Sequence, residues 1–114
     1  MLGADEAESL GGRDTGPDPY DYLCVALGAC TSMTIRMYAK RKDWPLRRVS
    51  VTVTHARTTT APGTPTVDTF RRIVVLEGDI DPDQRQRLLA IANKCPVHNT
   101  LTAGATIESE LAPA

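Results

Sequence analysis

The sequence has few aromatic residues, little net charge and no long apolar run, and each shortage excludes a class of function. Aromatic residues make up 4% of the 114 positions, too few for a surface that stacks nucleic-acid bases. The formal net charge is −1, with no block of like charges to attract nucleic acid or an anionic membrane. The longest apolar run, residues 22–30, falls well short of the ~20 residues of a membrane span. We therefore expect no nucleic-acid or membrane partner.

The sequence also has few cysteines and lacks the features of a secretory signal. Its first residues are acidic and small, without the basic region and apolar core of a signal peptide, so we expect a cytoplasmic protein. Three cysteines, an odd number in a reducing compartment, argue against a framework of structural disulfides. Packing, catalysis and metal binding remain as roles for these thiols.

The chain length and the turn signals predict one domain. Residues 1–16 read as a loop, and residues 17–114 as the domain. Asp18 followed by proline predicts the start of a long helix, which ends by Trp44 because a proline follows. The helix is apolar almost all round in its first half, so we expect it to be central and buried. The residues expected on its buried stripe are Leu23, Leu27, Cys30, Thr34 and Met37, widened by Ala26 and Met33.

Three later segments alternate apolar and polar residues, as β-strands do. Alternating valines predict a half-buried strand over 47–57, and residues 67–80 predict a second one. Residues 105–112 predict a short third strand that places Ile107 and Leu111 on one face.

A second helix is expected between the second and third strands. Asp81 is its expected N-cap, Pro82 takes the first helical position and Gln84 completes a capping box. The order helix, strand, strand, helix, strand predicts the α+β class, with helices packed on an antiparallel sheet.

Two of the three cysteines, Cys30 and Cys95, are candidates for a chemical role. Cys30 lies in GACTSMT on the apolar stripe, where a small core residue is the ordinary interpretation. Cys95 precedes a proline and can cap a helical turn over 96–101, where unpaired backbone N–H groups lower the pKa of a thiol. Cys24 points away from the face of Cys30, so we expect it to fill core space.

A zinc site is an alternative use of the same residues. Cys95 and His98 have the spacing of a chelating pair, but a complete set of ligands also requires Cys30 and His55. The sequence has no second pair of this kind, and we interpret His55 as a strand-edge residue and His98 as a neighbour of Cys95. It also has no Walker loop, G-x-S-x-G motif or glycine-rich turn between a strand and a helix. We expect neither a metal nor another cofactor.

The segments ALGACTSMT and CPVHNTL, with their surroundings from about Gly11 to the C-terminus, resemble the OsmC/Ohr family of thiol-dependent hydroperoxide-handling proteins. The most similar branch is that of OsmC-like redox proteins, including those fused to α/β-hydrolase domains. The resemblance implies that Cys30, on the central helix, attacks the peroxide and that Cys95, close to it in space, then closes a disulfide. It further implies an organic hydroperoxide as substrate, an external dithiol as reductant and an intertwined homodimer.

The chain departs from the family pattern at the residues that hold the reactive thiolate. The resemblance implies a glutamate ten residues before the first cysteine, which pairs with an arginine of an N-terminal strand. Tyr20 stands at that position here, and the N-terminal strands are largely missing. Asp21 and Arg13 are the substitutes that we name for this pair. A non-catalytic OsmC-like domain, which binds a small apolar ligand or a partner, is therefore the alternative hypothesis.

Overall fold

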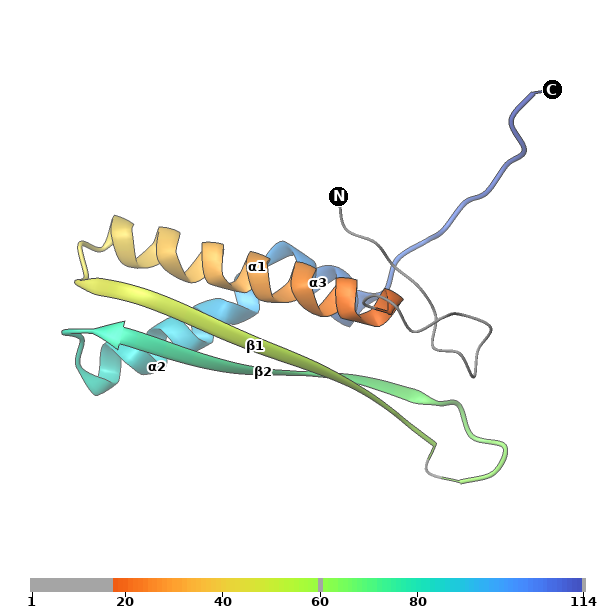
Figure 1. Ribbon diagram of the computed structural model, residues 1–114, viewed down its shortest axis with the longest axis horizontal. Coiled ribbons are helices and arrows are strands. Elements are labelled where there is room, and N and C mark those ends of the chain that lie inside the picture. Colours follow the sequence, from red (N-terminus) through yellow and green to blue (C-terminus); the bar gives the residue numbers. More distant parts are fainter. Residues whose placement is uncertain (1–17, 60, 114) are drawn as a thin grey trace.

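A long helix, a β-hairpin and a run of shorter helical segments follow one another along the chain (Figure 1). This computed structural model describes residues 18–59 and 61–113. Within them the α+β class predicted from the sequence is confirmed, and the loop predicted over 1–16 lies outside them. The elements are α1 (Pro19–Arg41), β1 (Leu46–Thr58), β2 (Val67–Gly78), α2 (Pro82–Ile91), the 3-10 turn η2 (Ala92–Lys94) and α3 (Pro96–Ala103).

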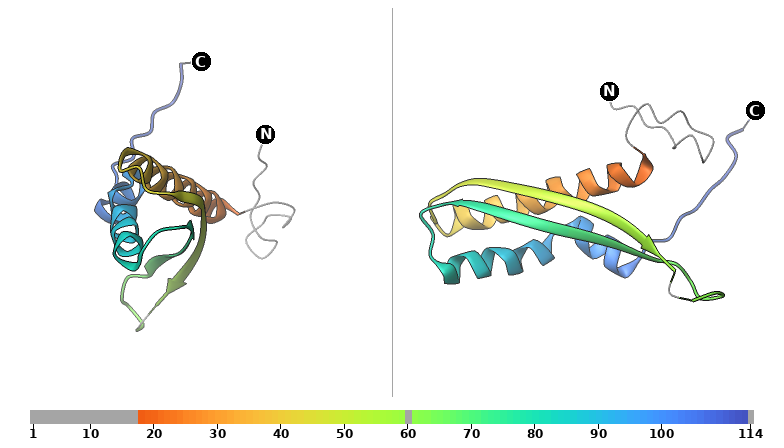
Figure 2. Two further views of the ribbon diagram at one scale, coloured as in Figure 1. Left: turned by 90° about the vertical axis from the view of Figure 1, so that its left-hand side faces the viewer. Right: turned by 60° about the horizontal axis from the view of Figure 1, so that its bottom comes forward.

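The helices form a layer against one face of the hairpin (Figure 2). α1 packs along β1 and also contacts α2, η2 and α3, which lie beside it. β1 and β2 are antiparallel, and their inward side chains include the buried Val49 and the half-buried Val74. Ile73 and Val75, on the other face, are about half exposed. No helix in the described residues combines the length and the apolar character of a membrane span.

Capping residues define where the helices begin. The Asp18 carboxylate accepts a hydrogen bond from the Asp21 backbone N–H at 2.9 Å, and the Asp21 carboxylate accepts one from Asp18 at 3.0 Å. Asp81 and Gln84 form the same reciprocal pair at the start of α2, at 2.8 and 3.0 Å. Both N-caps predicted from the sequence are confirmed, because each side chain satisfies an N–H that the helix leaves unpaired.

The buried stripe of α1 is displaced from the predicted one. Leu27 is buried as predicted, but Met33 and Met37 are 63% and 70% exposed. Thr31, which was not predicted to be buried, is 0% exposed. The reason is that one face of α1 packs against β1 and α2 and forms the main core there. The other apolar face of α1 is uncovered in the described part of the chain. That core consists of Ile35, Tyr38, Ala39, Val49, Ile80, Leu88, Ile91 and Ala92.

The prediction of a third strand is wrong. Residues 105–112 have no ladder partner within the described part of the chain and run away from the hairpin as an irregular segment (Figure 1). Ile107 and Leu111 are 88% and 96% exposed. Alternation indicates that a segment can form a strand, but backbone hydrogen bonds to a neighbouring strand are needed to form one.

Candidate active site around Cys30 and Cys95

The structure brings together the two cysteines that the sequence singled out. Cys30 lies on α1, and Cys95 is the residue that caps α3. Both are free thiols, close enough for each to influence the ionisation of the other through a hydrogen bond. Cys95 is fully buried, whereas Cys30 is partly exposed, so Cys30 is the thiol that a substrate can reach. Cys24 is also partly exposed and lies on a different face of α1.

Cys95 acts as a helix cap, as the sequence predicted. Its Sγ accepts a hydrogen bond from the backbone N–H of His98 at 3.4 Å, and Pro96 occupies the first position of α3. Proline has no N–H to leave unsatisfied there, and its fixed φ suits a helix start. The sulfur therefore faces the positive end of a helix, a setting that favours thiolate.

The two thiols differ in how readily they ionise. Burial opposes ionisation of Cys95, but the Cys30 thiol, the His98 N–H and the nearby Thr31 hydroxyl together outweigh it and lower the pKa of Cys95. Burial, followed by the hydrogen bond with Cys95, raises the pKa of Cys30. Cys95 therefore ionises first, and Cys30 keeps a proton that it can share with the Cys95 sulfur.

Arg72 supplies the cation beside this pair, and sequence reasoning missed it. It reaches from β2 and donates through Nη1 to Thr31 Oγ1 at 3.0 Å and to the carbonyl of Ala92 at 3.1 Å. Through Nη2 it bonds Asn93 Oδ1 and His98 Nδ1, both at 2.9 Å. The signal was present in the sequence, because Arg72 falls in phase with the inward-facing residues of β2.

His98 is held as a neutral imidazole. A guanidinium has no hydrogen-bond acceptor, so Nδ1 of His98 must accept the bond from Arg72 and the ring proton sits on Nε2. Burial, and then the charge of Arg72, lowers the pKa of His98. The side chain that was read as a neighbour of Cys95 is thus fixed by an arginine from the sheet.

Of Asp21 and Arg13, the substitutes named for the charge pair that the resemblance implies, Asp21 lies in the described structure and does not reach the thiols. Asp21 lies in the first turn of α1 and is engaged in the capping box with Asp18. The helix rise between Asp21 and Cys30 is about 14 Å, which is too far for direct contact. Arg13 lies outside the described residues.

A separate polar cluster forms around Tyr20 at the start of α1. The Tyr20 ring stacks on His55 with centroids 4.2 Å apart, and its hydroxyl accepts a hydrogen bond from Arg57. Asp68 Oδ1 contacts both His55 Nε2, at 2.8 Å, and Arg57 Nε, at 2.9 Å. This cluster joins the start of α1 to the hairpin, and His55 is engaged in it by Tyr20 and Asp68.

Within residues 18–59 and 61–113, no three His, Cys, Asp or Glu side chains are grouped closely enough to hold a metal ion. The zinc alternative used Cys30, Cys95 and His98, with His55 as a further ligand. His55 instead pairs with Asp68, and Nδ1 of His98 is occupied by Arg72. The donor set around Cys95 therefore suits thiol chemistry better than metal binding.

A broad groove begins beside the thiols. It holds about 1020 Å³ between α1 and the α2–α3 segment, and its apolar walls include Met37, Ile91 and Pro96. Thr34, also in its lining, donates to the carbonyl of Cys30 at 2.8 Å, and Pro96 directly follows Cys95. The groove therefore lies next to both cysteines along the chain, and its lining contains neither of them.

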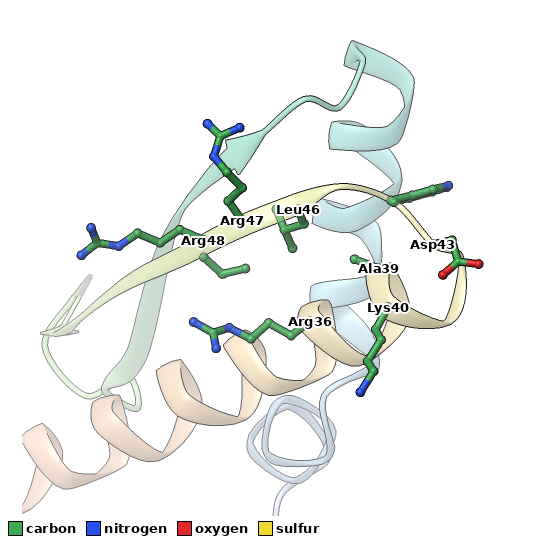
Figure 3. A pocket seen from close by; sticks show the side chains of 9 residues that line it. Arg36, Ala39, Lys40, Asp43, Leu46, Arg47 and Arg48 are labelled. Atoms are coloured by element: carbon green, nitrogen blue, oxygen red, sulfur yellow. The ribbon is translucent and has the colours of Figure 1, made fainter.

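A second hollow, of about 430 Å³, lies between the end of α1 and the start of β1 (Figure 3). Arg36 and Arg48 project toward its open side from the helix and the strand, and Lys40 comes from the next turn of α1. None of its lining residues is a cysteine or histidine. It is therefore a basic surface hollow separate from the thiol site.

Comparisons with solved structures show the fold to be shared. An organic hydroperoxide resistance protein OsmC from Legionella pneumophila superposes with a TM-score of 0.72 at 22% identity, over 88% of this chain and 72% of that one. An OsmC-like hydroperoxide resistance protein from Jannaschia sp. CCS1 gives a TM-score of 0.66 at 23% identity, over 88% and 69%. An OsmC-like protein from Mycoplasma pneumoniae gives 0.68 at 21% identity, over 77% and 64%.

Sequence comparisons assign the family. No curated protein gives a significant match to this chain. The OsmC-like protein family, in contrast, matches residues 11–110, which include both cysteines of the candidate site and nearly the whole described structure. The chain is a member of the OsmC-like protein family.

Proposed function

We propose that this protein reduces organic hydroperoxides with Cys30 and Cys95 as its two catalytic thiols. The observation that carries the proposal is the contact between a partly exposed thiol and a buried thiol that ionises more readily. Family membership and the likeness to structures described as hydroperoxide resistance proteins support the same reaction.

The first step oxidises Cys30. The Cys30 thiol passes its proton to the Cys95 thiolate and attacks the terminal oxygen of the hydroperoxide. An S–O bond forms and the O–O bond breaks, so that Cys30 becomes a sulfenic acid and the peroxide is reduced to an alkoxide. The alkoxide takes the proton back from Cys95 and leaves as the alcohol, which restores the Cys95 thiolate.

The second step closes a disulfide. The Cys95 thiolate attacks the sulfur of the Cys30 sulfenic acid, an S–S bond forms and hydroxide leaves to become water. The N-terminus of α3 stabilises Cys95 as the attacking anion. An external dithiol then reduces the disulfide by exchange and is itself oxidised, which returns both cysteines to their starting state.

The groove beside the thiols supports an organic substrate rather than hydrogen peroxide. Its walls include apolar groups such as Met37 and Ile91, and an alkyl chain on the peroxide removes apolar surface from water there. Hydrogen peroxide has no such group and gains nothing from these walls.

A homodimer is also part of the proposal. Val25, Met33 and Met37 are more than 60% exposed on α1, and Ile107 and Leu111 are almost fully exposed beyond α3. A second copy that covers these residues removes them from water. Size-exclusion chromatography with light scattering is expected to give a dimer at micromolar concentration, and a clean monomer contradicts this assignment.

Peroxide consumption by thiol variants tests the reaction. With an organic hydroperoxide and excess dithiol, Cys30→Ser is expected to fall to the uncatalysed background, because the attacking sulfur is gone. Cys24→Ser is the matched control, since it removes a thiol from the same helix, and it is expected to keep the wild-type rate. A wild-type rate equal to that of Cys30→Ser contradicts the proposal and favours the non-catalytic alternative.

A further inference from the structure

We propose that Arg72 is the positioning residue of the thiol pair, which fixes from the sheet the groups that donate hydrogen bonds to Cys95. The role of Arg72 in catalysis rests on the proposed function, but the hydrogen bonds from which it is inferred are those around the reduced thiols. Arg72 comes from β2, while the groups that it bonds belong to α1, η2 and α3. One guanidinium thus ties together all the helical segments that meet at Cys95.

Arg72 secures the turn that leads into Cys95. Its Nη1 donates to the carbonyl of Ala92 at 3.1 Å, and the same carbonyl accepts the backbone N–H of Cys95 at 3.4 Å. Its Nη2 donates to the side chain of Asn93, the next residue of η2. The backbone just before the cysteine is therefore held from two points by one rigid fork.

Arg72 also limits what the Thr31 hydroxyl can do. Thr31 is fully buried, accepts a hydrogen bond from Arg72 and donates its single hydrogen to the carbonyl of Leu27 at 2.7 Å. The hydroxyl also stabilises the thiolate form of Cys95. With a lone pair of its oxygen occupied by Arg72 and its hydrogen donated to the Leu27 carbonyl, the hydroxyl is fixed in place beside Cys95.

The contact with His98 secures the other side of Cys95. The Arg72 N–H points at Nδ1 of His98, and the backbone N–H of that residue caps the Cys95 sulfur. Fixing the imidazole fixes the first turn of α3, where the capping N–H lies. His98 acts here through its position and not as a base, because its Nδ1 lone pair is occupied.

The charge of Arg72 has no carboxylate partner among its described contacts. All of its hydrogen-bond partners are neutral acceptors, and the group in this cluster that can become an anion is the Cys95 thiol. The charged and titratable groups near that thiol come from every element around it. They are Cys30 from α1, Arg72 from β2, Lys94 from η2 and His98 from α3.

The test compares Arg72→Gln with Arg71→Gln in a Cys24→Ser background. Arg71 is the adjacent residue, exposed on the opposite face of β2, so the control removes the same charge without touching the cluster. The first readout is the ultraviolet absorbance of thiolate as a function of pH, with Cys30 and Cys95 as the titrating cysteines. Arg72→Gln is expected to move the first thiol titration to higher pH, and Arg71→Gln is expected to leave it in place.

A second readout is ¹⁵N NMR of the imidazole rings, in a chain that has only two histidines. His98 is expected to carry its proton on Nε2 in the wild type and in Arg71→Gln. In Arg72→Gln it is expected to lose this fixed tautomer and to protonate at higher pH, while His55 is unchanged. If Arg72→Gln fails to fold, Arg72→Lys is used, which keeps the charge without the fork and is expected to restore only part of both signals.

The same variants separate this inference from the proposed function. After one equivalent of organic hydroperoxide, disulfide closure in Arg72→Gln is expected to be slower by roughly tenfold or more, the effect of losing one hydrogen bond to a charged group. Thiol and histidine titrations that match the wild type in Arg72→Gln overturn the inference, even if the wild type reduces peroxide. Shifted titrations in a protein that consumes no peroxide leave Arg72 as a positioning residue and overturn the proposed function instead.

Discussion

Two arginine–histidine clusters join the hairpin to the helices, and they differ in what balances the arginine. Arg57 and His55 share the carboxylate of Asp68 near the start of α1. Arg72 and His98 lie beside Cys95, and the arginine bonds only neutral oxygens and an imidazole nitrogen. In the first cluster the carboxylate balances the charge of the arginine. In the second, the positive charge of the arginine lies beside a thiol that can become an anion.

The comparison separates a structural use of these residues from a chemical one. In the first cluster, hydrogen bonds from Arg57 and then His55 lower the pKa of Asp68, so its carboxylate stays ionised and the ion pair is permanent. In the second, Cys95, a thiol whose pKa is lowered by its hydrogen bonds, takes the place of the carboxylate. The same side-chain types therefore anchor the start of a helix in one cluster and prepare a thiolate in the other.

Replacing the arginine of each cluster is expected to give the largest difference between the two clusters, in the stability of the fold. Arg72→Gln takes a charged donor away from the buried Thr31 hydroxyl and from the Ala92 carbonyl, which then keeps the N–H of Cys95, and we expect a loss of about 2–4 kcal/mol in the free energy of unfolding. Arg57→Gln disrupts an exposed cluster that water can solvate, so its loss is expected to be much smaller. Urea denaturation of both variants measures this, and equal losses contradict the distinction.

A smaller effect is expected from one hydroxyl. Thr31→Val keeps the shape of the side chain but removes the acceptor for Arg72, with an expected cost of about 1–2 kcal/mol and a higher pKa for Cys95. Thr34→Val is the matched control on the same helix, because the Thr34 hydroxyl bonds the Cys30 carbonyl and acts on the Cys30 thiol rather than on Cys95. If the two variants have the same denaturation midpoint and the same thiol titration, the Thr31 hydroxyl has no special role.

The smallest effect concerns acid. The pKa of Asp68 is lower in the folded protein than its ordinary value of 3.8, so its contribution to stability is complete above pH 3.8 and is lost as the pH falls through the folded value. Asp68→Asn is expected to flatten this acid limb of the stability profile without changing the thiol titration. Denaturation midpoints measured from neutral pH to below 3.8 check the first expectation. An unchanged acid limb in the variant would show that Asp68 is not linked to folding.

The sequence predicted the parts of the site that depend on local signals. Asp18, Asp81 and Cys95 each precede a proline that opens a helix, and each is a cap in the structure. The proximity of Cys30 to Cys95 came from resemblance to a family rather than from spacing. The two cysteines are separated by 64 residues, and the periodicity of apolar residues does not predict that such distant segments meet.

What the sequence did not reveal depends on contacts between distant segments. Arg72 looked like an ordinary charged strand residue, and only its phase with Phe70 and Val74 indicated that it faces the helices. The buried face of α1 was misplaced because apolar residues surround the helix, and packing against β1 and α2 decides which of them are covered. The prediction of the third strand was wrong for the same kind of reason. A strand needs a neighbouring strand to pair with, and the alternation of apolar and polar residues does not provide one.

The central claim is that Cys30 and Cys95 form one redox centre, and mass spectrometry tests it most directly. Reduced protein is mixed with one equivalent of an organic hydroperoxide, and its intact mass and peptide map are then determined. We predict a rapid loss of two hydrogens that maps to a Cys30–Cys95 disulfide, retained in Cys24→Ser and absent in Cys30→Ser. An unchanged mass, or slow oxidation spread over all three cysteines, would contradict the claim.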